Sequence, residues 1–459
     1  MKIINVLPVL AMTFLLGCNQ GNDTGNTNAF NDPILFCKTV KNLNNVVLEN
    51  NFPPMIACRN YTYATIAAYE CVAAGDSNYI SLAGQIKHLP LLPKPPAGKE
   101  IDFSLAALFA FCKVGNAVTF PEGSMMGYYD QLKKMADSIG ISSPVLKNTI
   151  AFSDSVVSAI LKWSKEDNYA QTRTAERYTV LNDVPERYVP TPPQYASAVE
   201  PHWREIRTMV LDSASQFMPP RPTKYDVLNK NSVFYKAMLE VKSFGDSLTD
   251  EQKHIADFWD DNPFVMHVAG HVMFATKKFS PPGHWMNIVG IGAKTANADF
   301  NKTVAAYAHT SIALFDAFIS CWDEKYRSNY VRPETVINRL FTNENWQPYI
   351  QTPPFPSYTS GHATNSAAAA EVMTHWFGDQ LSFTDTSLLE FGIANREIKS
   401  FREAAKEAAM SRLYGGIHYR FDNDEGNKAG KKLGEFIVSR IKMSKGLSKG
   451  VPRDLTEKK

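Results

Sequence analysis

Three separated segments in the second half of the sequence combine cationic, hydroxyl and histidine residues. They read KYRSNYVRP at 325–333, PSYTSGH at 356–362 and SRLYGGIHYRFD at 411–422. Each segment alone has an ordinary structural explanation, because short motifs of this kind often match by chance. Their joint occurrence in this order, each with its own internal spacing, favours one shared binding site.

The cations of these segments predict an anion site. Lys325, Arg332 and Arg412 would be very unfavourable if they were buried together without an anion. The planar guanidinium groups of the two arginines can bind a tetrahedral oxyanion through paired hydrogen bonds. Ser360 and Gly361 lie at a predicted helix start, where they add a hydroxyl group and free backbone N–H groups.

Two histidines could give this anion site its chemistry. His362 and His418 can act on a bound anion as proton donor, base, ligand or nucleophile. Asp422 follows His418 by four residues, so its carboxylate could orient the imidazole if the segment is helical. A helix cap or a surface ion pair explains Asp422 equally well.

Helices must position these residues, because apolar residues recur at helical spacing while strand-like alternation is sparse. We predict helices over 300–327, over 360–370 and over 402–414, the last of them ending at Gly415 and Gly416. Helices that line one pocket form a bundle. The predicted fold class is therefore all-α.

The chain of 459 residues has an ordinary globular composition, with 44% hydrophobic and 20% charged residues. Its net charge of +2 argues against a nucleic-acid binder that works through a strong basic field. Proline-rich stretches between 189 and 225 interrupt the helices and mark a boundary. We expect five parts: a signal peptide at 1–18, a flexible tether at 19–33, an N-terminal helical region at 34–225, a catalytic helical domain at 226–441 and a polar tail at 442–459.

The first 18 residues resemble a bacterial lipoprotein signal. Lys2 precedes an apolar run from Ile3 to Leu16, which is too short to span a bilayer and ends at Gly17-Cys18. In such signals the cysteine is acylated after cleavage. We therefore expect an exported protein whose only membrane contact is a lipid on Cys18, in the outer membrane or facing the periplasm. A plain secretory signal is the alternative.

Five cysteines remain beyond Cys18. We expect Cys321 to be reduced and buried, because it lies in a strongly apolar predicted helix. In an exported protein this odd set allows two disulfides at most, without an assigned pairing, among the other four. These four are Cys37, Cys58, Cys71 and Cys112.

Two further histidines have a spacing that occurs in zinc sites. His267 and His271 are four residues apart, so two imidazoles on one helix face could bind zinc. The motif contains no glutamate and no third ligand is evident, so a pocket-lining or structural role is the stronger interpretation. We also expect a structural role for His284, in the sequence PPGHW.

Taken together, the pattern K-x6-R-P, S-G-H and S-R-x5-H-x3-D resembles the superfamily of type 2 phosphatidic acid phosphatases and vanadium-dependent haloperoxidases. The core motifs cover about 325–422, and the resemblance extends more weakly over 255–440. The stretches PPFPSYTSGHA and FWDDNPFVMHVAGH look like the haloperoxidase branch, including bacterial iodoperoxidases. Thr359 stands where the family usually has proline, a change that alters the turn but removes no contacting group.

The resemblance implies an all-α bundle of the haloperoxidase and acid phosphatase type, with an additional N-terminal helical region and a vanadate cofactor. It implies that His418 is the axial ligand of vanadium and that His362 is the acid and base that manages the protons of bound peroxide. Trp322 and Phe355 would shape the halide pocket. The vanadate oxygens would be held by Lys325, Arg332, Ser360, Gly361 and Arg412, with His362 nearby and Lys325 also polarising the peroxide.

The resemblance also implies the substrates. Hydrogen peroxide would oxidise a halide to hypohalous acid, with iodide favoured because it is the easiest halide to oxidise and bromide as the other candidate. One alternative is an acid phosphatase in which His418 attacks a phosphate ester and His362 protonates the leaving group. A second is a surface lipoprotein that binds phosphate-like anions without turnover, although simple binding would not require both histidines.

Overall fold

The computed structural model of the protein describes residues 29–446 except 263–264, 270–271 and 277. Between 263 and 277 only the backbone of two short strands is described. The expected signal peptide with Cys18, most of the tether and the end of the tail lie outside the described residues.

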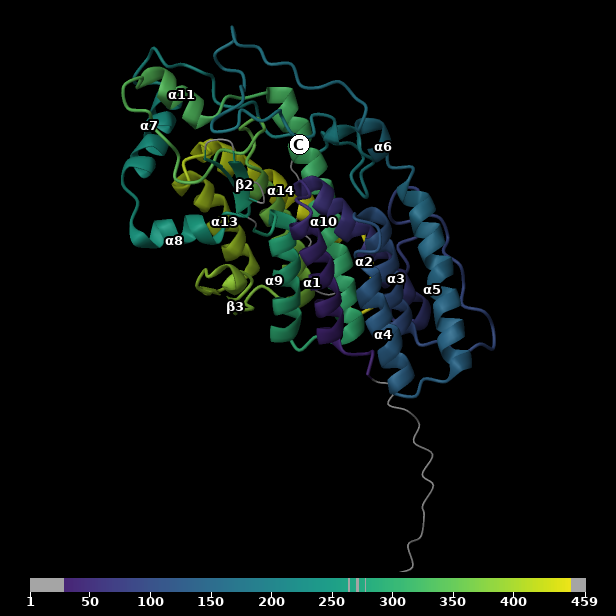
Figure 1. Ribbon diagram of the computed structural model, residues 1–459. Coiled ribbons are helices and arrows are strands. Elements are labelled where there is room, and N and C mark those ends of the chain that lie inside the picture. The colour runs from purple at the N-terminus through teal and green to yellow at the C-terminus, as the bar shows by residue number, and fades with distance from the viewer. Residues whose placement is uncertain (1–28, 263–264, 270–271, 277, 447–459) are drawn as a thin grey trace, which may run out of the picture.

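The described residues form fourteen α-helices and two small β-hairpins, which confirms the all-α prediction (Figure 1). The first helices are α1 (Pro33–Glu49), α2 (Pro54–Gly75), α3 (Phe103–Val118), α4 (Met126–Ser138), α5 (Ser143–Ser164) and α6 (Tyr169–Thr172). After a long segment with little regular structure come α7 (Val233–Asp246), α8 (Asp250–Phe258), α9 (Pro281–Thr295), α10 (Phe300–Ser328), α11 (Pro333–Leu340), α12 (Gly361–Phe377), α13 (Phe401–Tyr414) and α14 (Arg420–Arg440). The antiparallel hairpins are β1 (Val265–Ala269) with β2 (Val272–Thr276), and β3 (Phe383–Asp385) with β4 (Arg396–Ile398).

Helix α10 is the centre of the bundle and carries Lys325 in its last turn. The Asp299 side chain caps its start by accepting a hydrogen bond from the Lys302 N–H, and Asn329 ends it in a left-handed conformation. In Figure 1 it runs between α1, α2 and α9, and it also packs on α12. Its length and apolar composition would suit a membrane span, but the most apolar window is entirely buried in the bundle. Helix α10 is therefore the core helix of this fold.

The N-terminal helices share one apolar core with the helices that carry the motifs. The Phe36 ring of α1 packs edge-on against Phe111 of α3 and against Phe300 and Tyr307 of α10, with ring centroids 5.5 to 5.7 Å apart. The same buried cluster extends to Met443, beyond the last helix. The boundary at 225/226 stays a prediction, although the two regions are joined by a continuous core.

Glycines at every fourth position of α14 let this helix lie against α12. A Cβ atom at any of them would clash with the backbone of α12, so only glycine allows this approach. The packing holds the start of α12, at Ser360, against the start of α14, where the Asp422 carbonyl accepts a hydrogen bond from the Ser360 N–H at 3.0 Å. A Cβ added at Gly426 would lie 2.9 Å from the Ser360 carbonyl oxygen. One added at Gly430 would lie 2.0 Å from that of Thr364, and one added at Gly434 would lie 2.7 Å from that of Ala368.

The two disulfides that the sequence allowed are absent from the part of the chain that the structure describes. All five cysteines within it are free; they lie on α1, α2, α3 and α10, with Cys58 and Cys71 both on α2. Cys58 contacts the Ser311 carbonyl oxygen, and Cys321 contacts Thr359. The expectation that Cys321 is reduced and buried is confirmed.

The idea that His267 and His271 could bind zinc from one face of a helix is wrong. His267 lies in strand β1, opposite Phe274 of β2, so spacing by four residues does not place two side chains on one helix face here. His271 lies outside the described residues. The apolar, β-branched run on either side of these histidines forms a hairpin because valines favour extended backbone.

The contact between α12 and α14 yields a stability prediction. Replacing Gly430 by Ala should lower the free energy of unfolding by about 1–3 kcal/mol, because the added methyl group forces the two helices apart. The change is measured by urea denaturation with an unaltered m-value.

Gly127→Ala in α4 is the matched control. An added Cβ at Gly127 meets nothing within 4 Å, so the better helix propensity of alanine, about 0.8–1 kcal/mol, should leave stability equal or higher. Equal effects of the two substitutions would contradict the proposed role of the glycine contact.

Candidate active site

Two of the three motif segments line one cavity of about 50 Å³, and the first segment contacts its wall through Lys325 and Arg332. This volume holds a few water molecules, which suits a small anion and small co-substrates but not a bulky organic molecule. Much of the wall is apolar, including Pro281, Phe318 and Pro353. Six residues predicted from the sequence line it: Trp322, Phe355, Gly361, His362, Arg412 and His418.

Lys325, Arg332 and Arg412 are all buried beside this cavity, as predicted. The Lys325 Nζ donates hydrogen bonds to the carbonyl oxygens of Pro356 and Ser357 at 2.8 and 2.9 Å. A lysine ammonium has three N–H donors, so one remains for a ligand. Burial lowers the pKa of Lys325.

Arg332 is held by backbone carbonyls but keeps a free donor. Its Nε donates to the Phe355 carbonyl oxygen at 2.8 Å, and its Nη1 donates to Ile417 at 2.9 Å. Its Nη2 is buried and has no hydrogen-bond partner. A buried guanidinium nitrogen without a partner is unfavourable, so this atom indicates where an acceptor is missing.

Arg412 is held in the same way. Its Nε donates to Ser411 Oγ at 3.0 Å, and its Nη2 donates to the carbonyl oxygen of Trp259. Within the described part of the chain, no carboxylate lies within ion-pair distance of Arg412, Arg332 or Lys325. Three buried cations whose hydrogen-bond partners are uncharged leave positive charge that a small oxyanion would neutralise.

The start of α12 faces the same cavity. Ser360 is the N-cap residue, and its Oγ accepts a hydrogen bond from the Ala363 N–H at 3.4 Å. Gly361 lines the cavity, and a Cβ there would meet only Trp322, at 3.6 Å. The first N–H groups of a helix lack intrahelical partners and carry a partial positive charge, so this end favours an anion.

His418 presents a lone pair toward these cations. Its Nδ1 lies 2.8 Å from Asp422 Oδ2, and its Nε2 lies 3.1 Å from Arg332 Nη1. A guanidinium can only donate, so Nε2 must be the acceptor and Nδ1 must carry the hydrogen. Burial, together with Arg332 and Lys325, holds the pKa of His418 well below its usual range. Near neutral pH the ring is therefore a neutral imidazole that can serve as a ligand.

Asp422 orients His418, which was one of the alternatives left open by the sequence. The two residues do not, however, lie on the same helix. His418 lies before α14, and Asp422 is in its first turn. Asp422 Oδ2 also accepts hydrogen bonds from Ser357 Oγ and from the Tyr419 N–H, so it caps α14 as well. The two explanations considered for Asp422 thus hold together.

His362 has a partner that the motifs did not reveal. Its Nε2 lies 3.5 Å from Asp261 Oδ2, within ion-pair distance but beyond a good hydrogen bond. Burial and the nearby Arg412 cation lower the pKa of His362 to about 4. The ring is thus neutral near neutral pH and can accept a proton. Asp261 lies in the FWDDNPF stretch, where the acidic pair after an aromatic pair was the available signal.

Trp322 and Phe355 form one aromatic wall, with ring centroids 5.0 Å apart. The Lys325 Nζ lies 5.8 Å from the Trp322 centroid and 5.1 Å from that of Phe355. Arg332 also lies 5.1 Å from the Phe355 ring. The aromatic faces stabilise the buried cations.

The donor set fits a tetrahedral oxyanion such as vanadate. The unpartnered Arg332 Nη2, the third N–H of Lys325 and the start of α12 supply donors for anionic oxygens. The His418 lone pair could supply one nitrogen ligand for the central atom. Every site residue predicted from the motifs is either in the cavity wall or in contact with a residue of the wall.

Comparison with known proteins supports this interpretation of the site. A family model for the VCPO second helical-bundle domain matches residues 305–345 and 341–445, which include all three motifs. A vanadium chloroperoxidase from Curvularia inaequalis is 24% identical over a match that covers 28% of each chain. The chain thus spans less than a third of the length of that curated relative.

Solved structures extend the likeness to nearly the whole chain. A bacterial vanadium-dependent chloroperoxidase, 17% identical, shares the fold with a TM-score of 0.64 over 85% of this chain and 92% of its own. A bacterial vanadium-dependent iodoperoxidase is 42% identical, with a TM-score of 0.85 over 90% of this chain and 98% of its own. At that identity and coverage, the chain belongs to the family of vanadium-dependent haloperoxidases.

Proposed function

We propose that this enzyme uses hydrogen peroxide to oxidise a halide to hypohalous acid, with vanadate as its cofactor and iodide as its preferred halide. The observation that carries the proposal is the set of three buried cations without a carboxylate partner, arranged around the lone pair of His418. The similarity to a bacterial iodoperoxidase supports it. An acid phosphatase would use a similar pocket, but no contact in the described residues favours that alternative over the family result.

In this proposal the cations bind the cofactor and His418 fixes its position. Bound vanadate supplies a Lewis acid that activates peroxide without changing its own oxidation state. Asp422 holds the His418 ring through Nδ1, which leaves the Nε2 lone pair as the group that would bind the cofactor. The cofactor oxygens would be held by Lys325, Arg332, Ser360, Gly361 and Arg412.

His362 manages the protons of the reaction. Hydrogen peroxide, halide and one proton give hypohalous acid and water, so one group must take up a proton from peroxide and return it to the departing oxygen. The neutral His362 ring can do both at Nδ1, the nitrogen that does not face Asp261. The third N–H of Lys325 is not used by the backbone carbonyls, so it can stabilise negative charge on the reacting oxygen.

The wall formed by Trp322 and Phe355 is where we propose that the halide approaches. Its aromatic faces are polarisable and weakly hydrated, as is iodide, the largest of the common halides. The cavity is too small for a bulky organic acceptor to enter with the other reactants. Hypohalous acid would therefore leave the cavity and halogenate organic molecules outside it.

A direct assay tests this function. Protein reconstituted with orthovanadate should oxidise iodide in the presence of hydrogen peroxide, followed by the absorbance of triiodide, with a lower kcat/KM for bromide. A phosphate ester offered without peroxide is the control for the phosphatase alternative. Hydrolysis of the ester without any halide oxidation would refute the proposal.

Two histidine variants separate cofactor binding from turnover. His418→Ala should abolish vanadate retention on dialysis, because it removes the nitrogen ligand. His362→Ala should retain vanadate but lower kcat by about 10²–10⁴-fold, the usual contribution of a general acid and base. Retention is measured as vanadium per protein, and turnover as initial rates at saturating halide.

The control for both variants is His375→Ala. His375 is on the same helix as His362, but its ring packs on His309 and Trp376, away from the cavity. It should keep wild-type retention and kcat. Vanadate affinity that is the same in the wild type and in His418→Ala would disprove the assigned ligand.

We also propose that the protein is exported and anchored by a lipid on Cys18. The support is the sequence of the first 18 residues alone. The full chain expressed in a bacterium should incorporate labelled fatty acid and sediment with membranes, whereas Cys18→Ala should do neither. A Cys37→Ala variant is the control, and labelling that persists in Cys18→Ala would contradict the anchor.

A further inference from the structure

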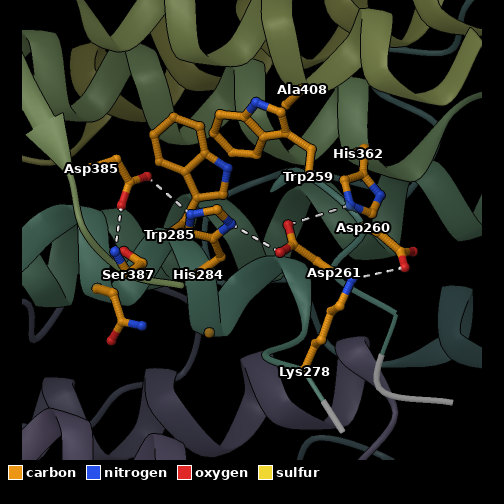
Figure 2. A network of polar contacts seen from close by, with 12 residues as sticks. Trp259, Asp260, Asp261, Lys278, His284, Trp285, His362, Asp385, Ser387 and Ala408 are labelled. Atoms are coloured by element: carbon orange, nitrogen blue, oxygen red, sulfur yellow. Dashed lines mark hydrogen bonds and ion pairs between the residues drawn. The ribbon is translucent and has the colours of Figure 1, made fainter. Parts of the chain in front are cut away.

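Four ionisable groups form a buried row that begins at the candidate acid and base, His362, and leads away from the cavity (Figure 2). Asp261 faces His362 Nε2 through Oδ2, at 3.5 Å, and faces His284 Nδ1 through Oδ1, at 2.9 Å. The His284 Nε2 then lies 3.0 Å from Asp385 Oδ2. The side chains of Asp261, His284 and Asp385 are at most 2% exposed, so solvent does not screen them.

The row is assembled from segments that are distant in sequence. Asp261 follows α8, His284 is in the first turns of α9, and Asp385 ends strand β3 of the small hairpin between α12 and α13. The Ser387 N–H donates to Asp385 Oδ1 at 2.9 Å and so fixes this carboxylate. None of these three residues belongs to the sequence motifs at 325–333, 356–362 or 411–422.

Neighbouring groups hold His284 in place. The Trp259 ring stacks on it, with centroids 4.8 Å apart and planes inclined by 29°. The carbonyl oxygen of Trp259 accepts a hydrogen bond from Arg412. The position of His284 is therefore coupled through one residue to a cation of the oxyanion site.

The contacts of His284 determine its charge. Both ring nitrogens face carboxylate oxygens, which only accept, so both nitrogens must carry hydrogens. Burial alone would lower the pKa of His284, but the two carboxylates raise it to about 10. Burial likewise would raise the pKa of Asp261, yet His284 and His362 hold it well below its usual range. Near neutral pH the row thus contains an imidazolium between two carboxylates.

We propose that His284 and Asp385 are positioning residues for the proton-transfer step: they hold the Asp261 carboxylate, ionised, against His362. The inference rests on the proposed haloperoxidase function, because it assigns the protons of that reaction to His362. One oxygen of Asp261 is fixed by His284, so the other is directed at His362 Nε2. From this ion-pair distance its negative charge stabilises the protonated ring.

A purely structural role does not account for the charge of the row. Replacing a buried ion pair by apolar groups of similar volume is often neutral or stabilising. Apolar side chains would therefore hold α9 against the hairpin at least as stably as these three buried charges. Their arrangement instead delivers one carboxylate oxygen to the acid and base of the site. Other groups near His362 are Arg412 from α13, the neutral His418, and Asp260, which pairs with Lys278 at 3.2 Å.

The row predicts the direction of a pH shift. Asp385→Asn leaves His284 with one carboxylate, which lowers the pKa of His284. A neutral His284 no longer offsets the charge of Asp261, so the pKa of His362 should rise. The limb of the kcat profile that is set by His362 should then move to higher pH.

The experiment compares Asp385→Asn and His284→Gln with the wild type, all as full chains loaded with orthovanadate. Both variants should lose about 10–100-fold in kcat for iodide oxidation, as is typical when an outer partner of a site residue is removed, with vanadate retention unchanged. Nitrogen-15 NMR of histidine-labelled, vanadate-free protein reports the charge of His284 directly. Its imidazolium signal should persist at pH 8 in the wild type and titrate at lower pH in Asp385→Asn.

Glu397→Gln is the matched control in the same hairpin. Glu397 is exposed and accepts a hydrogen bond from Thr384 Oγ1 at 2.7 Å, without contact to the row. It should keep wild-type kcat and pH profile. Circular dichroism checks folding, and if His284→Gln fails to fold, the isosteric Asp385→Asn decides alone.

The outcomes are distinct. A wild-type kcat and pH profile in Asp385→Asn, or an equal loss in Glu397→Gln, would overturn the positioning role. A neutral His284 at pH 8 in the wild type would overturn the charge assignment. If the wild type itself oxidises no halide, the proposed function fails, while the NMR titration still decides whether the charged row exists.

Discussion

The burial of three cations around one small cavity is the constraint on which the rest of the site depends. Lys325, Arg332 and Arg412 cannot be solvated by water at these positions, and backbone carbonyl oxygens replace part of their hydration. These carbonyl groups must be held in position, and they belong to the loop segments around 356–357, 417 and 259 that lie between helices. The remaining positive charge is what makes the cavity selective for an oxyanion.

Two kinds of structure keep that arrangement rigid. The cations and His418 come from helix ends and the loops next to them, where backbone groups are free to bind other partners. The helices themselves are fixed by close contacts such as the glycine face of α14 against α12, and by the aromatic packing around Phe36. The N-terminal helices contribute to the site mainly by burying the side of α10 that does not face the cavity, and Pro54 at the start of α2 also lines the cavity.

The sequence predicted the fold class and the motif residues because both depend on local patterns. Helical periodicity identified the segments of α10, α12 and α13, and the spacing of the motifs grouped their residues in one site. The sequence could not predict the row formed by Asp261, His284 and Asp385. These residues come from three distant segments, and sequence periodicity does not indicate which distant segments are in contact. The helical interpretation of His267 was wrong for a related reason: spacing by four residues has meaning only after the backbone conformation is known.

The free cysteines described above have a consequence for the chemical durability of the protein. A haloperoxidase releases an oxidant that attacks thiolates, and susceptibility follows thiolate character and exposure. Cys58, Cys71 and Cys112 are fully buried, and burial raises the pKa of each thiol far above its usual value. Burial raises the pKa of Cys37, the least buried of the five, to about 11. Burial therefore keeps these four thiols protonated, which slows their oxidation, and the described residues contain no disulfides.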